Sequence, residues 1–145
     1  MFAALALGAA VTGLGVTNGN AATVNLSTGL DATDTLITTG GTSDAHWTVD
    51  QSAGVTAAAQ VVTSSSTDWY SSWVADDPNS DWIARDASLQ NNGPASYAFY
   101  RSFDLTGLDA STASITGTWT IDDGGSLLLN GHSIASLSGE WGSLL

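Results

Sequence analysis

Aromatic side chains are concentrated in one polar stretch of the chain, between Ser64 and Gly93, where they suit sugar binding. Aromatic rings stack on the apolar faces of sugars, and neighbouring amides and carboxylates bond to the sugar hydroxyls. The candidate ligand-binding residues of this stretch are Trp69, Tyr70, Trp73, Trp82, Asn91 and Asn92. Trp73 and Trp82 each begin a short apolar triplet, so burial in the core is the favoured alternative for these two. Trp69 and Tyr70 are the better candidates for exposure.

Carboxylates are concentrated in two short runs, and carboxylate oxygens are the ligands that Ca²⁺ prefers. The candidate ligands are Asp76, Asp77, Asn79 and Asp81 in the first run, and Asp122 and Asp123 in the second. Neither run has the EF-hand spacing, which needs Asp at alternate positions, then Gly and a distal Glu. Calcium binding is therefore one hypothesis. The other is the more usual role of Asp, which is to cap turns by bonding to nearby backbone amides.

The residue types that enzymes use are sparse or unsuitably spaced. The chain has no Cys, which excludes thiol catalysis and thiolate zinc sites. Its two histidines, His46 and His132, stand in no metal-ligand or triad spacing. The sequence has neither a nucleophile elbow nor a glycine-rich phosphate loop, and nothing singles out one pair of Asp residues for glycoside hydrolysis. We predict that the chain is not an enzyme.

The charge balance is strongly acidic, with 14 acidic residues, two basic residues and a net charge of −12 at pH 7. Phosphate backbones and anionic membrane surfaces repel such a chain, so nucleic-acid binding is not expected. Arg101 is one of the two cations and lies between aromatic residues on a predicted strand. We expect it to form a structural ion pair with Asp104 or Asp122, and ligand anchoring is the alternative.

The hydrophobic pattern predicts an all-β fold. Apolar and polar residues alternate over 97–105 and 112–122, as in half-buried strands. Shorter candidate strands lie at 35–38, 46–49 and 60–63. Asn130-Gly131 separates two apolar segments and is a strong hairpin signal. Short strands joined by many turns are typical of antiparallel sandwiches.

The N-terminal segment has the composition of a secretion signal. Residues 2–16 are apolar and small, and the small residues near Ala21 and Ala22 suit signal peptidase, although no Lys or Arg precedes the run. The run is too short and too rich in Gly and Ala for a membrane-spanning helix. We therefore expect a signal at 1–22, a polar lead-in at 23–42 and a β-sandwich domain at 43–145.

The stretch from about Ala45 to Ser136 resembles the galactose-binding-like jelly-roll domains of secreted bacterial proteins, and the residues that carry the likeness are 100–134, YRSFDLTGLDASTASITGTWTIDDGGSLLLNGHSI. The segment 73–84, WVADDPNSDWIA, is similar to a variant common in Gram-negative bacteria, often followed by a PEP-CTERM sorting tail. The resemblance implies an antiparallel jelly roll at the cell surface or secreted from the cell, often with a structural calcium. This family adds closing strands after the Asn-Gly hairpin, so the resemblance also implies that closing strands are missing here.

Together these patterns predict a non-catalytic, extracellular module that binds a carbohydrate or a surface polymer. Two alternatives remain open at this point. One is a structural or adhesive protein of the envelope or matrix with no small ligand, and the other is an accessory domain of a glycoside hydrolase. Exposure of Trp69 and Tyr70 beside a groove favours the binding module, whereas buried aromatics and a featureless acidic surface favour a structural protein.

Overall fold

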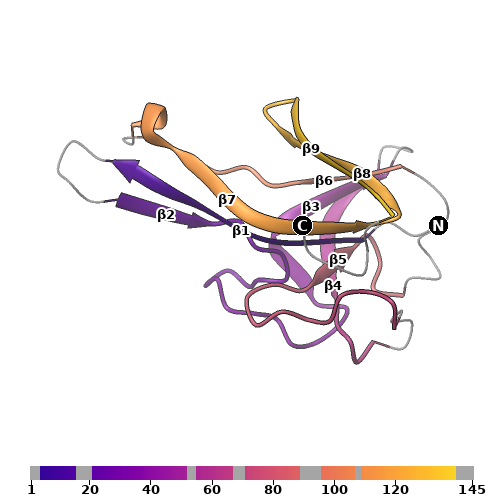
Figure 1. Cartoon of the computed structure of the whole chain (residues 1–145). Helices are drawn as coiled ribbons and strands as arrows, with labels where there is room; N and C mark the ends of the chain where they lie inside the picture. The colour runs from indigo at the N-terminus through magenta and orange to yellow at the C-terminus, as the bar shows by residue number, and fades with distance from the viewer. Residues whose placement is uncertain are drawn as a thin grey trace.

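The computed structural model is built from β-strands, as predicted (Figure 1). It describes residues 4–15, 21–51, 55–66, 71–88, 96–106 and 109–139. The strands are β1 (Ala4–Gly15), β2 (Ala21–Asn25), β3 (Ser43–Gln51), β4 (Val55–Val62), β5 (Trp82–Ala84), β6 (Tyr97–Tyr100), β7 (Ser114–Asp122), β8 (Gly124–Leu129) and β9 (His132–Ser138). A short 3₁₀ turn, η2 (Ala110–Thr112), precedes β7. Within these ranges no helix is long and apolar enough to cross a bilayer.

The strands form one large antiparallel sheet and one separate hairpin. The sheet has the order β2-β1-β5-β4-β3-β6, and β7 joins it by pairing with β1. The sheet is curled, and the β8–β9 hairpin lies over it next to β7 (Figure 1). A curled antiparallel sheet covered by a second layer is compatible with a β-sandwich.

The N-terminal strand β1 holds the centre of the sheet together. It pairs with β7 from Ala4 to Thr12 on one side, and with β2 and β5 on the other. Residues 4–15, which the sequence assigns to a secretion signal, are therefore a strand in this structure. The signal remains a prediction, and its removal would take β1 out of the sheet.

Alternation along the chain explains the later strands. Over 97–104 the side chains alternate between half-buried and exposed, which confirms that Tyr97, Phe99, Arg101 and Phe103 share the inner face. Strand pairing ends at Tyr100, however, so only part of the predicted strand at 97–105 is regular. The predicted hairpin is confirmed. Asn130 and Gly131 have φ angles of 51° and 81°, which the two central positions of a type I′ turn require.

Successive residues of β4 and β5 pack into two different hydrophobic cores, one on each face of these strands. The larger core lies inside the curled sheet and includes Trp47, Val49, Val61, Ile83 and Trp119. The hairpin covers it with the half-buried side chains Leu127, Ala135 and Leu137. The second core lies on the other face of β4 and β5 and contains Val62, Trp73, Trp82 and Ala84. A strand that is buried on both faces in this way reads as a continuous apolar run.

A buried carboxylate joins the start of β3 to the segment after β2. Asp44 is 3% exposed, and its two oxygens accept hydrogen bonds from four backbone amides. Oδ2 accepts from Gly29 at 2.6 Å and from Leu30 at 3.3 Å. Oδ1 accepts from His46 at 2.7 Å and from Trp47 at 2.9 Å. A charge buried this deeply is tolerated because donors surround both oxygens.

Candidate functional site

An open hollow of about 410 Å³ lies where three turns meet at one end of β4. Its lining is small and polar, and consists of Gly40, Gly41, Thr63, Ser65, Ser66, Ala87 and Ser88. Hydroxyl groups both donate and accept hydrogen bonds, so such a surface can pair with other hydroxyls. The hollow is therefore suited to a polar, uncharged ligand.

The turn after β4 fixes the hydroxyls of the hollow. Ser66 Oγ accepts a hydrogen bond from the Thr63 amide at 3.1 Å, and the Thr63 and Ser65 hydroxyls lie 2.8 Å apart. Gly40 makes this packing possible, because a Cβ there would lie only 2.6 Å from Ser66 Oγ. Gly41 has a φ of +83°, a conformation that glycine adopts without strain. In the sequence this Gly-Gly pair and the serine run are also ordinary turn signals, which is why the sequence did not single them out.

Two residues of the hollow immediately precede, in the sequence, segments that contain predicted ligand-binding residues. Ser66 is the last residue before the segment 67–70, and Ser88 is the last before the segment 89–95. The four residues that these segments contribute to the predicted site are Trp69, Tyr70, Asn91 and Asn92. All four lie outside the described residues, and their role stays a prediction.

Trp73 and Trp82 are core residues, which corrects their assignment to the sugar-binding set. They are 5% and 1% exposed, and their rings stack with centroids 4.4 Å apart. Both indole N–H groups are used internally, since Trp82 donates to the Val74 carbonyl and Trp73 donates to Asp122 Oδ2. Neither ring is exposed enough to stack on a sugar, so burial in the core, the alternative that the sequence favoured for these two residues, is their role.

The first acidic run folds into a compact turn before β5. Asp76 accepts hydrogen bonds from the amide and hydroxyl of Ser64, and Asp77 Oδ1 accepts from the amide of Asn79. Asp81 is 3% exposed and its carboxyl faces that of Asp76. Burial, and then the negative charges of Asp76 and Asp77, raise the pKa of Asp81 to about 7.

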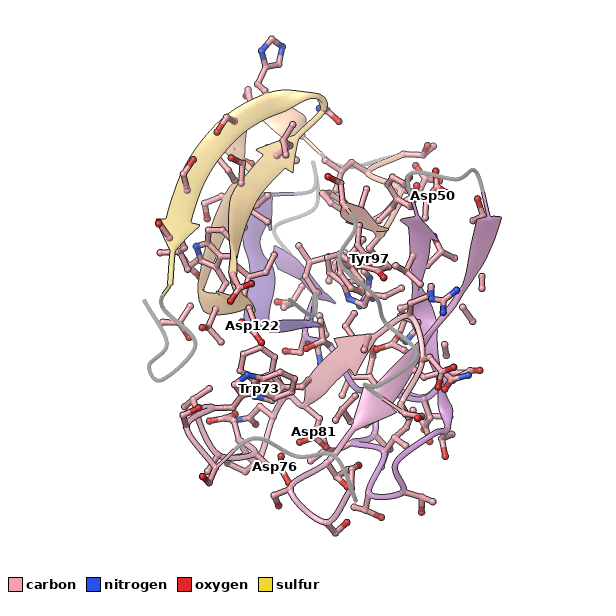
Figure 2. The ribbon with its side chains drawn as sticks, turned by 90° about the vertical axis from the view of Figure 1, so that its right-hand side faces the viewer. Asp50, Trp73, Asp76, Asp81, Tyr97 and Asp122 are labelled. Atoms are coloured by element: carbon pink, nitrogen blue, oxygen red, sulfur yellow. The ribbon has the colours of Figure 1, made fainter. Side chains whose placement is uncertain are left out.

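The second acidic run lies apart from the first. Figure 2 shows Asp122 on one side of Trp73, with Asp76 and Asp81 on the other. Burial, and then contact with Asp123, raise the pKa of Asp122 to about 6. The six predicted calcium ligands therefore do not form one site. In the part of the chain that the structure describes, no three acidic or histidine side chains converge as metal ligands.

Arg101 lies beside different carboxylates from those expected. The predicted partners were Asp104 and Asp122. The guanidinium instead lies near Asp34 and Asp44. Burial lowers the pKa of Arg101, and these two carboxylates offset only part of that effect. Its Nη1 also donates to the Ser27 carbonyl at 3.5 Å. The alternation of the strand explains the difference, because Asp104 points to the exposed face and Arg101 to the inner one.

The raised pKa values predict that the protein becomes less stable as the pH rises from about 4 to about 7. Over this range the folded state holds protons on Asp81 and Asp122 that the unfolded chain, with a pKa of 3.8, has lost. The free energy of unfolding therefore falls as the pH rises through this window. Below it, hydrogen bonds that lower the pKa of Asp31, Asp104 and Asp109 act in the opposite sense.

Urea unfolding followed by tryptophan fluorescence between pH 4.5 and pH 8 measures this effect. We expect Asp81 alone to contribute a loss of about 2 kcal/mol across the range, about half of the full conversion of its shift at 1.36 kcal/mol per pKa unit, because water screens part of the interaction, and Asp122 to add a smaller loss. The Asp81→Asn variant should show a flatter profile. A stability that increases from pH 5 to pH 8 would contradict the prediction.

No family model, curated protein or solved structure matches the chain.

Proposed function

We propose that this chain is a non-catalytic, extracellular module that binds a carbohydrate or a surface polymer in the hydroxyl-lined hollow. The observation that carries the proposal is the set of Ser and Thr hydroxyls that three turns bring to one open surface. Its volume of about 410 Å³ lies in the range of small-ligand sites. In the sequence, the candidates Trp69 and Tyr70 come shortly after Ser66, and Asn91 and Asn92 come shortly after Ser88; both serines line the hollow.

The chemistry of the surface favours a neutral polymer. With a net charge of −12, the chain repels polyanions, so sulfated, uronic or phosphate-rich polymers are poor partners. Neutral sugar hydroxyls pair with the serine and threonine hydroxyls, and the two glycines let a sugar ring approach the backbone closely. Specificity arises because a ligand that lacks matching hydroxyls leaves these groups unpaired.

The finer predictions about the family and location belong to the same proposal. We propose a jelly roll of the galactose-binding-like type, with which the antiparallel strands and the Asn130-Gly131 hairpin are compatible. Its export by a Gram-negative bacterium rests on the sequence pattern alone. Such a domain would act outside the cytoplasm, where neutral polysaccharides are abundant at the cell surface.

Affinity gel electrophoresis and calorimetry of the full chain with soluble neutral polysaccharides test the proposal. The double variant Ser65→Ala/Ser88→Ala removes two hydroxyls of the hollow, and we expect affinity to fall about 10- to 100-fold. The matched control is Ser133→Ala/Ser138→Ala on the exposed side of β9, which should bind as the parent does. Equal affinity for both double variants would place the ligand elsewhere, and no binding to any polymer would reject the proposal.

A structural or adhesive role is the second candidate, and the β8–β9 hairpin favours it. Within the described residues β8 and β9 pair only with each other, so each has an unpaired edge. The large apolar side chains Leu128 and Ile134 are exposed on the hairpin. Open edges and exposed apolar residues promote association between chains. Light scattering that shows concentration-dependent assembly, together with no polymer binding, would favour this role.

A further inference from the structure

Tyr100 is an exposed aromatic residue whose ring is held in position by a hydrogen bond. It ends the edge strand β6 and is 43% exposed, which makes it the one exposed large aromatic side chain among the described residues. Its hydroxyl donates to Asp50 Oδ2 on the neighbouring strand β3 at 3.0 Å. This bond limits rotation of the ring and leaves the phenol oxygen able to accept from another donor. An exposed ring that is already positioned binds a ligand with little further loss of side-chain entropy.

The row of residues across the sheet from Tyr100 consists of small side chains. Tyr100 pairs with Thr48 of β3, and Thr48 pairs with Ala58 of β4. All three are exposed. They lie on the outer face of the sheet, because the next residues in the sequence, Val49 and Ala59, are buried in the larger core. The ring therefore stands beside neighbours in its row that are too short to cover it.

The outer face of β4 connects this row to the hollow. Ala58 is followed on the same face by Gln60, whose Oε1 accepts a hydrogen bond from the Ala87 amide at 2.9 Å. Ala87 is one of the residues that line the hollow. With about 4.8 Å between strands and a rise of about 3.3 Å per residue, Tyr100 lies roughly 12 Å from Gln60 along the sheet. A sugar ligand that contacts both the hollow and the ring must therefore contain several linked units.

We propose that Tyr100 is a second contact for the neutral polymer, so that the chain binds an extended stretch of several sugar units and not a single sugar. The inference rests on the proposed function, since it takes the hollow as the first contact. The Tyr100 ring stacks on the apolar face of a sugar unit, and its oxygen accepts from a sugar hydroxyl. The carboxylate of Asp50 beside the ring is a further acceptor for neutral hydroxyls and repels anionic polymers.

Calorimetry of the full chain with short and long oligosaccharides tests the second contact. The probes are the disaccharides and hexasaccharides of the glucan, mannan, xylan and galactan series. The disaccharide reaches the hollow alone, whereas the hexasaccharide also reaches Tyr100, so we expect the hexasaccharide to bind about 5- to 10-fold more tightly. Tyr100→Ala should remove this gain and leave the affinity for the disaccharide unchanged. Tyr100→Phe keeps the ring and should retain most of the gain.

The matched control is Leu128→Ala, because Leu128 is also exposed but lies on the β8–β9 hairpin, and both affinities should stay unchanged. Should Tyr100→Ala fail to fold, Tyr100→Thr takes its place, since β-branched residues suit a strand.

The outcomes separate this inference from the proposed function. If Ser65→Ala/Ser88→Ala weakens both probes but Tyr100→Ala weakens neither, the second contact is wrong and the proposed function stands. Equal affinity of the parent chain for the two probes also overturns the second contact. If Tyr100→Ala weakens the binding of a lysine-rich peptide and not that of the hexasaccharide, the ring serves a basic partner and the inference is wrong. A parent chain that binds neither the probes nor the polymers rejects both proposals.

Discussion

A chain that begins at residue 23 is expected to lose cooperative unfolding, because β1 is the strand that joins the two halves of the sheet. Among the described strands, β7 pairs only with β1, and so does β2. The ladder between β1 and β7 covers nine residue pairs, from Ala4–Asp122 to Thr12–Ser114. Removing β1 leaves the backbone amides and carbonyls of one side of β7 without partners, and each such group that remains buried costs about 1–3 kcal/mol.

The loss should exceed the stability of a domain of this size, which is about 5–15 kcal/mol. Far-UV and near-UV circular dichroism of 23–145, with urea titration, should show weak tertiary signal and a broad transition. The matched control is Ala9→Pro in the full chain. Proline in a central strand removes a ladder donor opposite Gly117 and should cause a smaller loss of the same kind.

The result also decides how the secretion-signal prediction fits the fold. A sharp transition of 23–145 at the midpoint of the full chain would show that β1 is dispensable and would favour a cleaved leader. The mass of the protein isolated from its native cells provides the independent check. If the leader is removed and 23–145 does not fold, another strand must fill the place between β7 and its neighbours, since an unpaired central edge promotes aggregation.

Local signals in the sequence were sufficient for the C-terminal half of the fold. Period-two alternation locates β7 and the faces of β6, and the Asn130-Gly131 pair locates the hairpin, because these features depend on neighbours in the chain. The segment of β1 could not be assigned in this way. A run of small apolar residues is the pattern of a secretion signal and equally that of a central strand, and only its partners distinguish the two.

The candidate site was predictable only in part, because its residues come from turns that are distant in the sequence. Gly40, Ser66 and Ser88 meet because β4 pairs with β3 and β5. Taken alone, each is an ordinary turn residue that no motif singles out. Burial is also decided by long-range packing. The sequence identified the acidic run at 76–81, yet which of its carboxylates is enclosed depends on Gly29, more than 45 residues away.

The burial of Asp44, like that of Asp81, is decided by segments distant in the sequence. We expect its replacement by Ala to destabilise the fold more than the loss of any exposed carboxylate. The change leaves four backbone amides without acceptors, those of Gly29 and Leu30 on one segment and of His46 and Trp47 on the other. All four lie in or beside the core. We expect the free energy of unfolding to fall by about 4 kcal/mol, which corresponds to a drop in Tm of more than about 10 °C.

The Asp44→Asn variant separates charge from shape at this position. The amide oxygen of Asn can accept from one pair of backbone N–H groups, but its NH₂ group faces the other pair as a donor toward donors. Asn should therefore recover less than half of the loss. The control is Asp104→Ala, an exposed carboxylate that accepts from the amide and hydroxyl of Thr106 and whose removal should cost far less than that of Asp44. Equal losses for Asp44→Ala and Asp104→Ala in urea unfolding would contradict the role of Asp44. A full loss in Asp44→Asn, equal to that of Ala, would instead show that both oxygens must be acceptors for β3 to dock on the segment that follows β2.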